Sequence, residues 1–270
     1  MSRRDALTWV LEAEVFPASH AAMRDAVVAR GHEVVLWTDE WVWGARWPRL
    51  DGPVVFHGSL GNADFVARSS LWRPGAFCNT EAFRCTAWYP AAQPWLLHET
   101  WVSTTVAAFV ASPAAVFDAL DADAAVFVRP DSPLKPFSGR ALRRDAVSLD
   151  ALDHGFYYDD DALPIIVAPI RNVEREWRYV VVDGHVVAGS AYAADGRTAL
   201  PDDPNGAPWA FAAKVAKALP LPDPVTVLDV CACDGRLRLL ELNPFSGADL
   251  YACDRTGVVR AVSAVVARSA

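Results

Sequence analysis

The second half of the sequence carries two pairs of long apolar segments, and an Asp-Gly step joins each pair. Glu176–Val182 and His185–Tyr192 flank Asp183-Gly184, while Val225–Cys233 and Leu237–Asn243 flank Asp234-Gly235. Asp-Gly between segments of this kind is a strong signal for a β-hairpin. The pattern therefore predicts antiparallel sheet, with further strands expected at 124–129 and 165–170 and helices at 208–219 and 255–268.

The first hundred residues follow a different pattern, in which strands and helices alternate. Strands are expected at 6–10, 33–37 and 53–57, and helices at 18–30, 103–110 and 113–120. Such alternation is typical of an α/β lobe. We therefore predict an α/β (α+β) chain with an N-terminal α/β lobe at 1–112 and a largely antiparallel region at 113–270.

Composition excludes several classes of protein. The formal net charge of −8 argues against a nucleic-acid partner, since that affinity comes mainly from Lys and Arg on phosphates. The apolar runs fall short of the ~20 residues that cross a bilayer, so no membrane partner is expected. The N-terminal apolar stretch is short and interrupted by acidic residues, unlike a signal peptide, which predicts a cytoplasmic protein whose five cysteines are buried thiols.

Three oxygen-bearing side chains are expected to meet near the carboxyl end. Glu241 and Asn243 share one face of a strand, because side chains alternate along it. A three-residue turn at 234–236 would place Asp229 opposite Glu241, whereas a two-residue turn would put Asp229 on the other face. Oxygen donors of this kind suit Mg²⁺. The alternative is that they are ordinary solvated residues.

Two basic residues lie close together at the end of another strand. The apolar segment 124–128 leads to Arg129, and a proline-rich loop then leads to Lys135. Two such cations suit a nucleotide triphosphate, whose neighbouring phosphate oxygens need neutralising. A surface pair without function is the alternative, but Lys135 is one of only three lysines in the chain, which favours a functional role.

A third pair lies on the strand before Asp183-Gly184. Glu176 and Arg178 share one face, and Trp177 points to the other. A two-residue turn would set Gly189 opposite Arg178, leaving room for a ligand. A simple ion pair is the alternative interpretation.

The order of these motifs resembles the ATP-grasp superfamily of ligases over about residues 124–254. An Arg and Lys, a Glu-aromatic-Arg strand and a terminal acid-x-Asn-Pro are most similar to a divergent clade. That clade includes the eukaryotic cell-division-cycle protein that assembles a translation initiation factor. The resemblance implies an ATP-grasp fold whose antiparallel sheets clasp the nucleotide. Ser190 to Tyr192 stand where the eukaryotic relative has a further arginine.

The resemblance also implies a function and roles for residues. We expect an ATP- and Mg²⁺-dependent carboxylate–amine ligase acting through an acylphosphate on a peptide, protein or amino acid. The alternative is a non-catalytic ATP-binding assembly factor for a protein partner. Arg178 and Lys135 are the expected catalytic residues; the implied ATP contacts are Arg129, Lys135, Ala168, Pro169, Ile170, Glu176 and Arg178, and the implied Mg²⁺ ligands are Asp229, Glu241 and Asn243.

Overall fold

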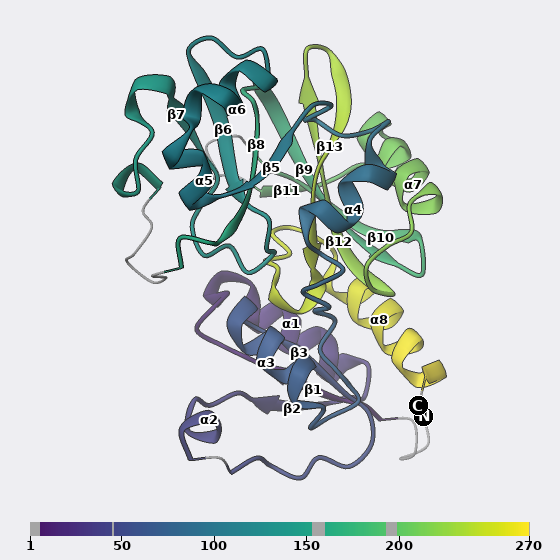
Figure 1. Cartoon of the computed structure of the whole chain (residues 1–270). Coiled ribbons are helices and arrows are strands. Elements are labelled where there is room, and N and C mark those ends of the chain that lie inside the picture. Colours follow the sequence, from purple (N-terminus) through teal and green to yellow (C-terminus); the bar gives the residue numbers. More distant parts are fainter. Residues whose placement is uncertain (1–5, 45, 153–159, 193–198, 270) are drawn as a thin grey trace.

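The computed structural model describes residues 6–44, 46–152, 160–192 and 199–269. These residues form three sheets (Figure 1), a parallel one in the lower part of the view and two antiparallel ones above it. The N-terminal residues 1–5, on which the expected lack of a signal peptide partly rests, lie outside the described residues. The ATP-grasp architecture expected from the sequence, with an α/β lobe followed by two antiparallel sheets, is confirmed.

The N-terminal lobe is a parallel sheet of order β2-β1-β3-β4. The central strand β1 is buried on both faces, as parallel strands covered by helices are. Ser59 caps α3 by accepting a hydrogen bond from the Asn62 amide at 3.3 Å, so Gly58-Ser59 is an ordinary strand-to-helix turn. The elements are β1 (Thr8–Leu11), α1 (Pro17–Ala29), β2 (Glu33–Leu36), α2 (Glu40–Gly44), β3 (Val54–His57), α3 (Leu60–Ser69) and β4 (Pro74–Gly75).

The second sheet is antiparallel and has the order β5-β8-β6-β7. Its inner face packs on α5 and α6 around Phe109 and Phe117. The helix expected at 103–110 is wrong in its first part, because Val102–Thr105 pairs with β8 as an edge strand before the helix begins. The elements are β5 (Val102–Thr105), α5 (Val106–Ala111), α6 (Pro113–Ala119), β6 (Ala125–Pro130), β7 (Arg140–Arg143) and β8 (Pro164–Pro169).

The third sheet contains both predicted hairpins and has the order β11-β10-β9-β12-β13. One face packs against α4 and α7 through Trp177, Tyr179 and Val181, and the other packs against α8 through Val180 and Val182. The elements are α4 (Cys85–Ala92), β9 (Val173–Val182), β10 (His185–Tyr192), β11 (Ala199–Pro201), α7 (Ala207–Ala218), β12 (Val225–Cys233), β13 (Arg236–Pro244) and α8 (Arg255–Ser269); short 3₁₀ turns lie at Arg144–Ala146, Asp150–Leu152 and Phe245–Gly247.

Both hairpins have two-residue turns followed by a bulge. Asp234 and Gly235 both have positive φ, at 52° and 69°, as a type I′ turn requires. Leu240 is then an extra residue in β13, because Val230 pairs with Leu239 while Asp229 pairs with Glu241. The predicted pairing of Asp229 with Glu241 is therefore confirmed, but a bulge produces it and the predicted three-residue turn is wrong.

The second hairpin corrects another expectation. Val187 is the extra residue in β10, so Ser190 lies opposite Arg178 and Gly189 lies opposite Tyr179. A Cβ atom at Gly189 would meet the Tyr179 ring at 2.6 Å. The missing side chain therefore makes room for core packing, and the predicted opening beside Arg178 is wrong.

Two sets of contacts cross the expected division at residue 112. Strand β5, before it, pairs with β8, after it. Helix α8, from the end of the chain, packs against α1 of the N-terminal lobe (Figure 1), and Trp9 donates a hydrogen bond to Ser263. The division of the chain at this residue stays a prediction.

Two further sequence expectations concern the helices and the cysteines. None of the helices in the described part of the chain combines the length and apolar composition that a bilayer crossing requires. The five cysteines are free thiols and are all buried. Burial raises the pKa of Cys78, Cys231 and Cys253 to about 12, so these thiols stay protonated at neutral pH.

We predict that Gly189→Ala lowers the free energy of unfolding by about 1–3 kcal/mol, because the new methyl group would overlap the Tyr179 and Trp209 rings. Urea unfolding measures the effect. Gly61→Ala is the matched control, since a Cβ atom there meets nothing within 4 Å. Equal unfolding midpoints for the two variants would contradict the prediction.

Candidate active site

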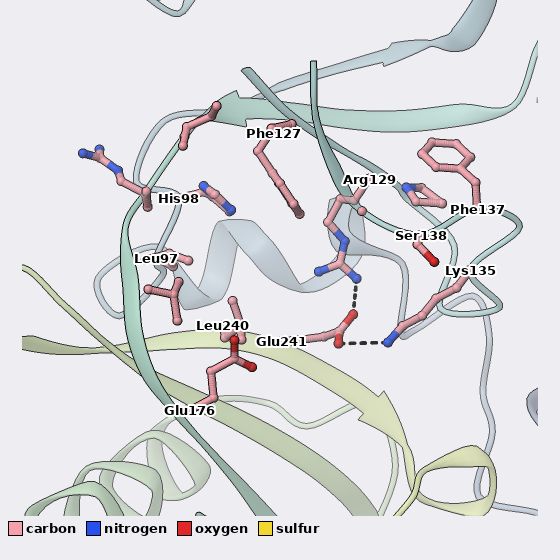
Figure 2. A pocket seen from close by; sticks show the side chains of 16 residues that line it. Leu97, His98, Phe127, Arg129, Lys135, Phe137, Ser138, Glu176, Leu240 and Glu241 are labelled. Atoms are coloured by element: carbon pink, nitrogen blue, oxygen red, sulfur yellow. Dashed lines mark hydrogen bonds and ion pairs between the residues drawn. The ribbon is translucent and has the colours of Figure 1, made fainter. Parts of the chain in front are cut away.

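A cavity of about 540 Å³ lies between the two antiparallel sheets. This volume is within the range of small-molecule sites in proteins. Figure 2 shows charged side chains at one end, where Arg129, Lys135 and Glu241 meet, and the rings of His98 and Phe127 toward the other. The lining residues are Leu97, His98, Phe127, Arg129, Pro130, Lys135, Phe137, Ser138, Gly139, Ala141, Ile170, Arg171, Val173, Glu176, Leu240 and Glu241.

The alternation of β6 aims Arg129 into the cavity. Val126 and Val128 are fully buried in the core below the sheet, so Phe127 and Arg129 occupy the opposite face. The loop that follows is anchored by Asp131, whose carboxylate accepts hydrogen bonds from the Thr86 amide and hydroxyl at 2.8 and 2.9 Å. This contact fixes the start of the loop to the first turn of α4.

Lys135 and Arg129 both pair with one carboxylate from the opposite sheet. Lys135 Nζ lies 3.0 Å from Glu241 Oε2, and the Arg129 guanidinium binds the other oxygen (Figure 2). Lys135 has a left-handed backbone with φ of 51°, which is uncommon outside glycine and turns the loop back toward the cavity. Glu241 thus joins β13 to the second sheet.

The second ion pair is more deeply buried. Arg178 on β9 binds Asp229 on β12 through two parallel hydrogen bonds of 2.8 and 2.7 Å, and it donates a third to the Asp249 carbonyl. Asn243 Nδ2 donates to Asp229 Oδ2 at 3.0 Å. The structure therefore brings Asp229, Glu241 and Asn243 to one face of the paired strands β12 and β13, as predicted.

The cations determine how these carboxylates ionise. Burial by itself would raise the pKa of Glu241, but Arg129 and Lys135 outweigh burial and hold that pKa well below its usual range. Burial would likewise lower the pKa of Arg178, and contact with Asp229 reverses the effect. Glu241 and Arg178 are therefore both charged at neutral pH.

Glu176 lies at the edge of this cluster and lines the cavity. The Tyr192 hydroxyl donates to Glu176 Oε2 at 2.5 Å, and the Tyr192 ring packs on Tyr251 with centroids 4.8 Å apart. The Arg178 guanidinium covers the Tyr251 ring at 4.8 Å. Burial raises the pKa of Glu176. Tyr192 and Tyr251 are neighbours of the site that sequence analysis did not identify.

The segment expected to meet the base lies at the other end of the cavity. Ile170 lines the cavity, whereas Ala168 is fully buried within β8 and neither Ala168 nor Pro169 is among the lining side chains. His98 lines this end as well, and its ring stacks on Phe127. Sequence analysis missed His98 because it lies in the aromatic, turn-rich stretch to which no element was assigned.

The donor atoms are of a kind that suits Mg²⁺. Two carboxylates and an amide oxygen are hard ligands, and all three come from rigid strands. Within the described residues, no three His, Cys, Asp or Glu side chains are grouped as a metal site, and both carboxylates are paired with cations. The set therefore fits a cation that is completed by phosphate and water, and its role as a metal site stays a prediction.

Comparison with known proteins places the chain in a family. A family model described as an ATP-grasp domain, the second family of its clade, matches residues 96–261. A search of the curated proteins by sequence found no match. Because the matched region is more than half of the chain, the protein belongs to the ATP-grasp superfamily. The closer resemblance to the clade of the eukaryotic assembly protein stays a prediction.

Solved structures share the fold across the whole chain. D-cycloserine synthetase DcsG superposes with a TM-score of 0.66 at 17% identity, covering 97% of this chain and 99% of that one. The ATP-grasp ligase PsnB, complexed with a minimal precursor, Mg and ADP, gives 0.60 at 13% identity, covering 98% and 99%. The D-alanine–D-alanine ligase from Bacillus anthracis gives 0.61 at 10% identity, covering 98% and 99%.

We predict that the contribution of Glu241 to stability declines on acidification. Its pKa is about 4.3 in an unfolded chain and lower in the folded protein, so the stabilisation is present at pH 7 and is lost as the pH falls below about 5. Urea unfolding of the native protein and Glu241→Gln should differ clearly at pH 7 and less at pH 4. A difference that grows toward pH 4 would contradict this sign.

Proposed function

We propose that the protein is an ATP- and Mg²⁺-dependent carboxylate–amine ligase that forms an amide or peptide bond. The observation that carries the proposal is the convergence of Arg129, Lys135 and Arg178 with Asp229 and Glu241 at the charged end of the cavity. These groups come from two facing sheets. The cavity is large enough for a nucleotide, with an apolar end for the base and a charged end for phosphates.

The charge balance of the site supports a requirement for Mg²⁺. The three cations face three carboxylates, Glu176, Asp229 and Glu241, so the cluster is close to neutral by itself. A triphosphate would add uncompensated negative charge in a largely buried site, which is costly. Divalent cations bound with the triphosphate restore the balance, and Asp229, Glu241 and the amide oxygen of Asn243 would hold them.

Each cation has a role in the proposed reaction. Arg129 and Lys135 would bind the phosphates, and Arg178 would contact the phosphoryl group as it moves from ATP to a substrate carboxylate. The products of that step are ADP and an acylphosphate. The amine then attacks the acyl carbon, phosphate leaves and the amine loses a proton to water. Catalysis consists of positioning and charge neutralisation, and Glu176 would orient Arg178 or contact ribose.

Peptide, protein and amino-acid substrates are the proposed class. The structures with the same fold include a D-alanine–D-alanine ligase and a ligase complexed with a precursor. We further propose cytoplasmic localisation without a nucleic-acid or membrane partner, in keeping with the net charge of −8.

The second candidate is a non-catalytic ATP-binding assembly factor that grips a protein partner. The motif order resembling the eukaryotic clade favours it, and it would use the same nucleotide site. Incubating the protein with ATP and candidate amino acids or cell lysate, and monitoring ADP together with product mass, separates the two. ATP bound without turnover favours the assembly factor, and ADP with a coupled product favours the ligase.

We predict that Glu241→Ala abolishes ADP formation, because it removes a proposed metal ligand and the partner of both phosphate-binding cations. A coupled ADP assay measures the loss, and circular dichroism checks the fold. Glu174→Ala is the matched control, since this exposed glutamate lies on β9 outside the cavity lining. Undiminished turnover in Glu241→Ala would reject the site.

A further inference from the structure

His98 is held rigidly in the wall of the cavity. The backbone before it is fixed to β13, because the Leu97 amide donates to the Leu239 carbonyl at 2.9 Å and the Leu239 amide donates to the Trp95 carbonyl at 2.7 Å. The His98 ring stacks on Phe127, with centroids 5.2 Å apart and planes 14° from parallel. Figure 2 shows the ring beside Phe127, away from the ion pairs of Glu241.

The ring has an unmet hydrogen-bonding capacity. His98 is only 6% exposed, and its Nδ1 atom is buried without a hydrogen-bond partner among the described residues. An unpaired buried polar atom of this kind is costly and calls for a physical explanation. Because the ring lines the cavity, a molecule bound there is the natural source of a partner.

The chemistry of the ring defines what that partner must be. The ring lies near the Pro169 carbonyl, which can only accept a hydrogen bond, so one ring nitrogen turns its proton there. Burial lowers the pKa of His98 to about 4, so the ring is neutral at pH 7 and its other nitrogen carries a lone pair. The missing partner is therefore a hydrogen-bond donor.

We propose that His98 selects adenine in the nucleotide by accepting a hydrogen bond from the 6-amino group of the base. This inference rests on the proposed function, since it assumes that the cavity holds ATP. Adenine carries a donor at this position, whereas inosine and guanine carry an oxygen that would face the lone pair of His98. The second torsion of a histidine side chain is broad, so a small turn of the ring brings the lone pair to the base.

The test compares ATP with purine riboside triphosphate, which lacks the 6-amino group, by calorimetric measurement of Kd with Mg²⁺ at pH 7. The native protein should bind ATP roughly three- to tenfold more tightly, the usual value of one hydrogen bond. In His98→Phe, which keeps an aromatic ring against Phe127, the two nucleotides should bind equally. His185→Phe, an exposed control on the hairpin turn, should keep the native preference.

Other outcomes overturn the inference. A preference of the same size in the native protein and in His98→Phe means that the residue acts only through packing, as does equal binding of both nucleotides by the native protein. If His98→Phe does not fold, His98→Leu removes the same nitrogens and replaces it. Failure of the native protein to bind ATP at all would overturn the proposed nucleotide site together with this inference, whereas loss of the preference alone leaves the proposed function standing.

Discussion

The carboxylate of Glu241 is the point at which the two antiparallel sheets are tied together. It comes from β13 and binds cations from β6 and from the loop after it, so one side chain connects both walls of the cavity. The contact is partly buried, with 13% of the Glu241 side chain exposed, and losing either partner leaves a charge in a poorly solvated place. The width of the charged end therefore depends on this one residue.

Arg178 and Asp229 extend this constraint into the interior. Their two parallel hydrogen bonds fix the guanidinium in orientation, and Asn243 fixes the far side of Asp229. Charged groups held in advance in this way need little rearrangement when a ligand arrives, which is the arrangement that electrostatic catalysis requires. The strands supply the rigidity, since β9 and β12 pair along their full lengths.

Much of this arrangement could be predicted from the sequence. Alternation placed Glu241 with Asn243 and Glu176 with Arg178, and the Asp-Gly steps located both hairpins. The register could not be derived in the same way, because the bulges at Leu240 and Val187 carry no signature that distinguishes them from their neighbours. His98 escaped for a different reason. It lies in a segment without regular structure, and only the folded chain brings it to the cavity.

The packing of α8 on the N-terminal lobe has a consequence for how the molecule is made. Trp9 lies on the strand that is synthesised first, yet its indole is paired with Ser263, 254 positions later in the sequence. The apolar face of β1 therefore stays uncovered until almost the entire chain has left the ribosome. Contacts between such distant residues slow folding and expose a nascent chain to aggregation. This lobe, although it comes first, should be among the last parts to reach its native state.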